Sequence, residues 1–178
     1  PEGIPHSCFI WSSDHGKTWR ISPPAVATAF SSSESQIAQL ADGSLLLSMR
    51  NEKKTGLRGW ARFEWSGDLS RGRWSEPWLA LPDPTCQASL LRHSSGVLLF
   101  SNPNSAKERV AMTVRASRDE GRSWSAGQLL DPRPSSYSCL TELDDGSIGI
   151  LYECGDSYAA ATLVFARFKL GWVTGQSP

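Results

Sequence analysis

The stretch Ser12-Ser13-Asp14-His15-Gly16-Lys17-Thr18-Trp19 returns in altered form as Ser117-Arg118-Asp119-Glu120-Gly121-Arg122-Ser123-Trp124. Both copies read S-x-D-x-G-x-[ST]-W. The Asp side chain can accept hydrogen bonds from turn amides, Gly permits a left-handed backbone, and Trp can pack beneath the turn. The spacing lacks the run of oxygen ligands of a calcium loop. We therefore interpret both copies as hairpin turns, in preference to substrate or metal sites.

The two copies are the outer members of a repeat. Asp14 and Asp119 are 105 residues apart, and the aspartate of a degenerate copy, Asp68, divides that interval into 54 and 51. A second turn motif recurs in step, with glycines 53 and 50 residues apart, at Asp42-Gly43-Ser44, Ser95-Gly96-Val97 and Asp145-Gly146-Ser147. A period near 50 residues is typical of propeller blades.

Short apolar or alternating segments between these turns predict strands. They are Ser44 to Met49, Val97 to Phe100, Val110 to Ala116, Ser147 to Tyr152 and Thr162 to Phe168. No long amphipathic helix competes with them. The sequence thus predicts an all-β fold, a β-propeller of which residues 1–178 form about three to four blades. Because a propeller closes with typically four to eight blades, we expect further sequence, upstream, to complete the ring.

Composition narrows the possible functions. Eighteen basic residues balance eighteen acidic ones, so the overall field gives nucleic acid little attraction, and local arginines must hold any anionic ligand. The apolar stretch Ala159 to Phe165 is far shorter than the roughly 20 residues of a membrane span. No signal peptide is visible in Pro1 to His6.

The cysteines and histidines show no metal-binding or redox spacing. Cys8, Cys86, Cys139 and Cys154 form no C-x-x-C pair, so we expect buried free thiols, with disulfides as the alternative in an exported protein. His6, His15 and His93 are expected to be exposed. No metal and no organic cofactor is implied.

The motifs between the turns resemble the bacterial and lysosomal exo-α-sialidases (neuraminidases), whose catalytic domain is a six-bladed propeller carrying Asp boxes like the two copies above. The resemblance runs along nearly the whole chain. Its more specific parts are Ser33-Glu34-Ser35-Gln36, Leu40-Ala41-Asp42-Gly43, Met49-Arg50-Asn51, Leu81-Pro82-Asp83-Pro84-Thr85, Phe100-Ser101-Asn102-Pro103, Arg109, Thr113-Val114-Arg115, Tyr137-Ser138-Cys139-Leu140 and Leu151-Tyr152-Glu153.

In that family three arginines clamp the sugar carboxylate, a Tyr and Glu pair performs the nucleophilic step, and an Asp is the general acid. Matched motif by motif, Arg50 and Arg109 resemble the second and third arginines, Glu34 the carboxylate beside the nucleophile, and Tyr137 the nucleophile. The first arginine and the acid Asp have no counterpart in this sequence. Glu153 and Asn102, also in family-like segments, are expected to be structural positions.

The residue types suit a sialic acid, which bears a carboxylate on its anomeric carbon. That carboxylate would repel an anionic nucleophile, whereas a phenol is neutral. A free Tyr has a pKa of about 10, so Glu34 could take its proton while the arginines favour the developing charge. Arginine suits the carboxylate because its planar fork donates two parallel hydrogen bonds.

The resemblance implies a retaining exo-α-sialidase, with residues 1–178 as the C-terminal portion of its catalytic domain. Its expected partners are sialylated glycans and the missing N-terminal part of the propeller. A trans-sialidase, a non-catalytic sialic-acid-binding propeller and a purely structural propeller are the alternatives. The substrate favours an extracellular or periplasmic location, with the lysosome as the alternative.

Overall fold

The protein is all-β, as the sequence predicts. The computed structural model describes residues 4–28 and 30–175, so part of the Pro1 to His6 segment lies outside it. The strands are β1 (Ile10–Trp11), β2 (Arg20–Ile21), β3 (Ser32–Gln39), β4 (Leu45–Asn51), β5 (Leu57–Glu64), β6 (Arg73–Trp74), β7 (Trp78–Pro82), β8 (Ser89–Arg92), β9 (Leu98–Pro103), β10 (Val110–Ser117), β11 (Gln128–Glu142), β12 (Ile148–Cys154) and β13 (Thr162–Phe168). A short 3-10 helix, η1 (Leu69–Arg71), and the helix α1 (Leu170–Thr174) accompany them.

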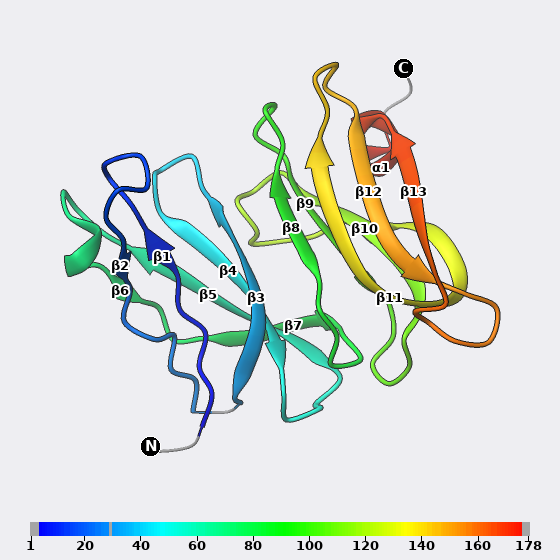
Figure 1. The fold of residues 1–178 in the computed structure, drawn as a ribbon, viewed down its shortest axis with the longest axis horizontal. Helices are drawn as coiled ribbons and strands as arrows, with labels where there is room; N and C mark the ends of the chain where they lie inside the picture. The colour runs from blue at the N-terminus through cyan, green and yellow to red at the C-terminus, as the bar shows by residue number, and fades with distance from the viewer. Residues whose placement is uncertain (1–3, 29, 176–178) are drawn as a thin grey trace.

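The strands pair with their neighbours in sequence, as in propeller blades. One sheet has the order β3-β4-β5-β6, with β7 also paired to β5, and a second runs from β8 to β13. In Figure 1 the two sheets stand side by side, with β3 and β8 where they meet. The long strand β11 pairs with β10 through Pro134 and with β12 from Ser135 onward. The second sheet is therefore two blade units joined by one continuous strand.

The turn motifs occupy equivalent places in successive units. The first Asp box connects β1 to β2, and the second connects β10 to β11. The degenerate copy lies between β5 and β6, where Asp68 caps η1 by accepting a hydrogen bond from Ser70 N at 2.8 Å. The turn glycines Gly43, Gly96 and Gly146 all have positive φ and open the hairpins that follow β3, β8 and the second half of β11.

The Asp boxes have the predicted internal bonding. Asp119 accepts hydrogen bonds from Ser123 N at 2.8 Å and from Ser123 Oγ at 2.5 Å. Asp14 accepts the matching pair from Thr18 N at 2.9 Å and Thr18 Oγ1 at 2.6 Å. The hydrogen bonds from these side chains lower the pKa of each aspartate to about 2. Both aspartates are thus ionised and stabilise their turns by hydrogen bonding.

The two box tryptophans differ in their packing. Trp124 packs on Trp60 and Phe100, with ring centroids 5.3 and 5.7 Å away. Trp19 is 60% exposed, although its Nε1 donates to Gly16 O at 3.1 Å. Trp19 thus contacts the turn of its own box, as predicted, but stays largely exposed, whereas Trp124 packs against residues of other strands.

The hydrophobic core is divided among the contacts between units. One cluster, centred on Trp60, Phe100 and Leu98, joins the β3–β7 sheet to β8 and β9. Another lies under β4 and β5 around Phe30 and Met49, and a third joins β9 to β12; its members are Val97, Leu99, Met112, Val114, Ala116, Leu140, Ile148, Ile150, Tyr152, Cys154 and Val173. Burial between units fixes the position of each inner strand relative to the next.

The expectation that His93 is exposed is wrong, and the expectation of buried free thiols is right in part. His93 is buried, 7% exposed, because its ring bridges Ser95 Oγ at 2.9 Å and Gly146 O at 3.0 Å across two turns. Of the four cysteines, all free, Cys139 is exposed and Cys8 is half-buried, while Cys86 and Cys154 are buried. In the part of the chain that the structure describes, no helix has the length and apolarity needed to cross a membrane.

Candidate active site

Two β-bulges aim the predicted carboxylate and phenol. The register of β3 on β4 shifts between Ser32 and Ser35, so that Ser33 and Glu34 together oppose Arg50. The register of β11 on β12 shifts between Ser135 and Ser138, where Tyr137 lies. A bulge leaves its extra residue out of the ladder and re-aims the side chain, and such irregularities are common beside active sites.

Glu34, Arg50 and Tyr137 meet in one hydrogen-bonded set, although Glu34 and Tyr137 are 103 residues apart. The Tyr137 hydroxyl donates to Glu34 Oε1 at 2.6 Å, and Arg50 Nη1 donates to Glu34 Oε2 at 2.7 Å. Arg50 Nη1 also donates to the Tyr137 hydroxyl oxygen at 3.3 Å. Each group therefore contacts the other two directly.

The pKa values of Glu34 and Tyr137 are shifted in opposite directions. Partial burial disfavours ionised Glu34, but the hydrogen bonds from Tyr137 and Arg50 outweigh it and lower the Glu34 pKa. The hydrogen bond to Glu34 raises the pKa of Tyr137, and partial burial acts in the same direction. Near neutral pH the resting pair is thus a carboxylate and a neutral phenol, and the carboxylate is positioned to accept the phenolic proton.

Arg109, immediately before β10, completes the predicted set on the other side of Tyr137. Its guanidinium carbon lies 5.7 Å from the centroid of the Tyr137 ring. Nη1 donates to Ser136 Oγ at 3.1 Å, and Nη2 donates to Thr85 O at 3.4 Å. All four predicted site residues are therefore brought together.

Beside this set lies an open pocket of about 410 Å³, lined by Arg50, Lys54, Pro84, Thr85, Ala106, Lys107 and Arg109. Its charged lining residues are all cations. The two lysines come from the loops that follow β4 and β9 and are exposed, whereas the two arginines are partly buried. A pocket of this charge favours an anionic ligand.

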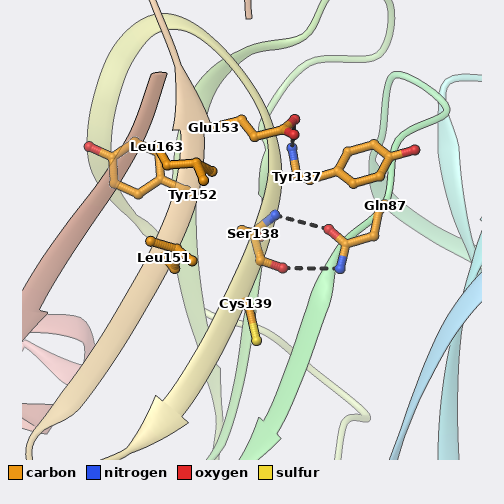
Figure 2. Close-up of a pocket in the computed structure, with 8 residues that line it drawn as sticks. All are labelled: Gln87, Tyr137, Ser138, Cys139, Leu151, Tyr152, Glu153 and Leu163. Atoms are coloured by element: carbon orange, nitrogen blue, oxygen red, sulfur yellow. Dashed lines mark hydrogen bonds between the residues drawn. The ribbon is translucent and has the colours of Figure 1, made fainter. Parts of the chain in front are cut away.

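The backbone at Tyr137 is held by neighbouring side chains, as Figure 2 shows. Glu153 Oε2 accepts a hydrogen bond from Tyr137 N at 3.1 Å. The Gln87 amide pairs with the next residue, accepting from Ser138 N at 2.9 Å and donating to Ser138 O at 3.0 Å. The Tyr137 ring points away from Leu163 in that view. Glu153 thus has the structural role expected for it.

Asn102 also has a structural role, beneath the pocket. Its Nδ2 donates to Pro82 O at 2.8 Å and to Asp83 Oδ2 at 3.3 Å, and its Oδ1 accepts from Arg115 Nη1 at 3.2 Å. Within residues 4–28 and 30–175, His, Cys, Asp and Glu form no group of three suited to an ion.

Gln87 and the buried pair Arg58 and Asp83 are not among the predicted site residues, although Asp83 lies in the family-like segment Leu81 to Thr85. A signal for Gln87 was present, since Glu34, Gln87 and Tyr137 are separated by 53 and 50 residues, the spacings of the turn glycines. Arg58 offers no such signal, because an arginine in a strand is ordinarily read as a surface residue. Its side chain and that of Asp83 are both fully buried, 3.4 Å apart.

Fold and site together define a set of Asp-box propeller blades with a Tyr, Glu and Arg cluster at the ends of the inner strands. The chain belongs to the family of BNR repeat-like domains, whose model matches residues 2–150. It is 35% identical over 175 residues to a sialidase of Micromonospora viridifaciens, a match that covers 93% of this chain and 26% of that protein.

Solved structures agree with this assignment. A Hadza microbial sialidase superposes with a TM-score of 0.78 at 37% identity, over 94% of this chain and 33% of that one. A leech intramolecular trans-sialidase, complexed with 2,7-anhydro-Neu5Ac, superposes with a TM-score of 0.73 at 25% identity, over 96% of this chain and 28% of that one. The chain thus spans between a quarter and a third of the length of these relatives.

Proposed function

We propose that residues 1–178 form the C-terminal portion of the catalytic propeller of an exo-α-sialidase, which removes terminal sialic acid from glycoconjugates. The observation that carries the proposal is the contact of Tyr137 with Glu34 and Arg50, at 2.6 and 3.3 Å. Blade folding alone does not require this set, and the Micromonospora and Hadza relatives named above are sialidases. The proposed protein acts on sialylated glycans outside the cell or in the periplasm, with the lysosome as the alternative.

In the proposed first step the Tyr137 oxygen bonds to the anomeric carbon while the bond from that carbon to the departing oxygen breaks. Glu34 takes the phenolic proton, for which its ionised Oε1 is placed at 2.6 Å. The departing oxygen must gain a proton, which in sialidases comes from the acid Asp whose motif has no counterpart in this sequence. Proton transfer to Glu34 removes the charge that raises the Tyr137 pKa, so the nucleophile forms only as the reaction proceeds.

In the second step water attacks the same carbon while the tyrosyl bond breaks. Glu34 returns its proton to the phenolic oxygen, and the proton lost by water passes to the Asp that acted as the acid in the first step. Two displacements at one carbon retain the anomeric configuration. Arg50 and Arg109 flank the phenol, and their forks would hold the sugar carboxylate and so orient the anomeric carbon toward Tyr137. A neutral phenol approaches the sugar carboxylate without the repulsion that a carboxylate nucleophile would meet.

Turnover of a fluorogenic sialoside tests the proposal. Turnover should be measured for this 178-residue chain and for the full-length protein that contains this chain in its source organism. Tyr137→Phe removes only the hydroxyl and serves as the matched control for contaminating activity. We expect the active form to lose turnover by orders of magnitude in this variant. Undiminished turnover in Tyr137→Phe would exclude the tyrosine mechanism.

Two alternatives have specific support. A leech intramolecular trans-sialidase is among the similar structures, so transfer is an alternative to hydrolysis, and product analysis with an added galactoside separates the two. The cationic pocket at Arg50 and Arg109 is equally suited to binding without catalysis. A binding protein would lose affinity for sialic acid in Arg50→Ala and Arg109→Ala while hydrolysing nothing in any form.

A further inference from the structure

A buried ion pair lies beneath the candidate site and takes no part in the chemistry proposed above. Arg58, on β5, and Asp83, after β7, have fully buried side chains, with Arg58 Nη1 3.4 Å from Asp83 Oδ2. Burying two charges carries a large desolvation penalty, and apolar replacements of such pairs are often neutral or stabilising. Stability alone therefore does not account for the pair.

Both members of the pair hold one short turn, residues 83–86. Arg58 Nη1 donates to Cys86 O at 2.6 Å, and Asp83 Oδ1 accepts from Cys86 N at 3.0 Å. The pair is in turn fixed to the first sheet, because Arg58 Nε donates to Ser48 Oγ on β4 at 2.9 Å. Both backbone polar groups of Cys86 are thus tied to the sheet that contains β4.

The turn held in this way is strained. Thr85 has φ of +59°, a left-handed conformation that is a genuine outlier for a β-branched residue. Such a conformation persists only where the surroundings impose it, and it is found most often at functional sites. The hydrogen bonds to Asp83 and Cys86 on either side of Thr85 are the imposing contacts.

The strained residue, Thr85, also contacts the guanidinium of Arg109. Thr85 O accepts a hydrogen bond from Arg109 Nη2 at 3.4 Å, and Ser136 Oγ accepts one from Nη1 at 3.1 Å. Cys86 Sγ lies 3.6 Å from the same Ser136 Oγ. The turn therefore touches both supports of the guanidinium.

We propose that Arg58 and Asp83 are positioning residues for Arg109. By holding Thr85 in its left-handed conformation, they set the Arg109 fork beside Arg50 so that both can bind one carboxylate. This inference rests on the proposed function, since it takes that carboxylate to belong to a sialic acid. Neither residue of the pair touches the ligand.

The test compares binding of methyl α-sialoside with binding of its carboxyl methyl ester, which lacks the charge that the arginines recognise. The ratio of the two affinities reports the arginine clamp and is insensitive to a general loss of folded protein. Asp83→Asn keeps the side-chain shape and an acceptor for Cys86 N but leaves Arg58 unpaired. Because hydrogen bonds to charged groups are worth more than tenfold in affinity, we expect the ratio to fall about tenfold or more.

Two further variants keep the test decisive. The double variant Arg58→Met with Asp83→Leu replaces the pair by apolar side chains of similar size, a change that proteins often tolerate, and it should lower the ratio as Asp83→Asn does. Ile148→Ala is the matched control, because Ile148 is fully buried in the cluster between β9 and β12, away from the turn. It should lower the melting temperature and leave the ratio unchanged.

The outcomes separate this inference from the function on which it rests. Wild-type protein that binds acid and ester equally well overturns both the sialic-acid site and the positioning role. Wild-type protein that prefers the acid, with the same preference in the folded double variant, overturns the positioning role alone. An equal loss of preference in Ile148→Ala would also reduce the pair to a structural one.

Discussion

Replacing Glu34 by Gln tests the proton transfer at the centre of the proposed mechanism. Gln has the same shape and can still accept a hydrogen bond from Tyr137, but it cannot take the phenolic proton. The Tyr137 oxygen lies 2.6 Å from Glu34 Oε1, within the range required of a general base. General-base catalysis typically contributes about 10²- to 10⁴-fold. We expect kcat of Glu34→Gln to fall by that factor, with a smaller effect on KM because Arg50 and Arg109 remain.

The pH dependence gives a second measure of the same step. Glu34 must be ionised to act as the base, and its pKa is below the usual value. The wild-type rate should therefore rise with pH at a midpoint below that of an ordinary Glu, and the fall at higher pH should report the general acid instead. In Glu34→Gln this acidic limb should disappear. The phenolic absorbance of Tyr137 should also titrate at lower pH in the variant, because the carboxylate that raises its pKa is gone.

Glu52→Gln is the matched control. Glu52 Oε1 lies 3.0 Å from Arg50 Nε, so the variant removes the same charge from the same arginine without touching Tyr137. It should keep kcat near the wild-type value and keep the acidic limb. Glu34 is not the base if Glu34→Gln turns over at the wild-type rate or retains the acidic limb, or if Glu52→Gln is equally impaired.

Three predictions concern the boxes and turns, and urea unfolding checks each. Trp124→Ala should cost about 3 kcal/mol, as for a packed aromatic, and Trp19→Ala well under 1 kcal/mol, because Trp19 is 60% exposed. Gly121→Ala should destabilise more than Gly43→Ala: both have positive φ, but a Cβ at Gly121 would lie 2.5 Å from a leucine side chain, whereas that at Gly43 meets nothing within 4 Å. Because the Asp119 pKa is lowered to about 2, the stability it contributes should be complete above about pH 4 and lost as pH falls toward 2; Asp119→Asn should flatten this dependence.

The fold was predictable because its signals are local. A turn needs its Asp and Gly within a few residues of each other, so the boxes and the glycine turns mark the blades without knowledge of distant contacts. The strand predicted over Thr162 to Phe168 has the same bounds as β13. The four site residues were found through a resemblance, and their meeting across 103 residues of chain could not follow from local pattern.

The burial of several residues depends on partners far away in the sequence. Trp19 and Trp124 occupy the same place in one motif, yet only Trp124 has Trp60 and Phe100 to pack against. His93 is buried because Gly146, 53 residues later, closes over it. Arg58 is buried only because Asp83 folds back to meet it. Burial of such polar residues depends on tertiary pairing, which the average burial of each residue type does not predict.

The repeat also explains how a nearly symmetric scaffold makes an asymmetric site. Glu34, Gln87 and Tyr137 recur at the spacings of the turn glycines, so the same inner-strand position is presented three times around the ends of the blades. At the middle position the side-chain amide of Gln87 is hydrogen-bonded to the backbone of Ser138. Glu34 and Tyr137 are left to face each other. Register shifts occur at the first and third of these positions, and the three side chains differ: the proposed base, a residue that holds the neighbouring strand, and the proposed nucleophile. Exchanging Gln87 for Glu should therefore disturb Tyr137 through the strand that carries it, and not through direct contact with a ligand.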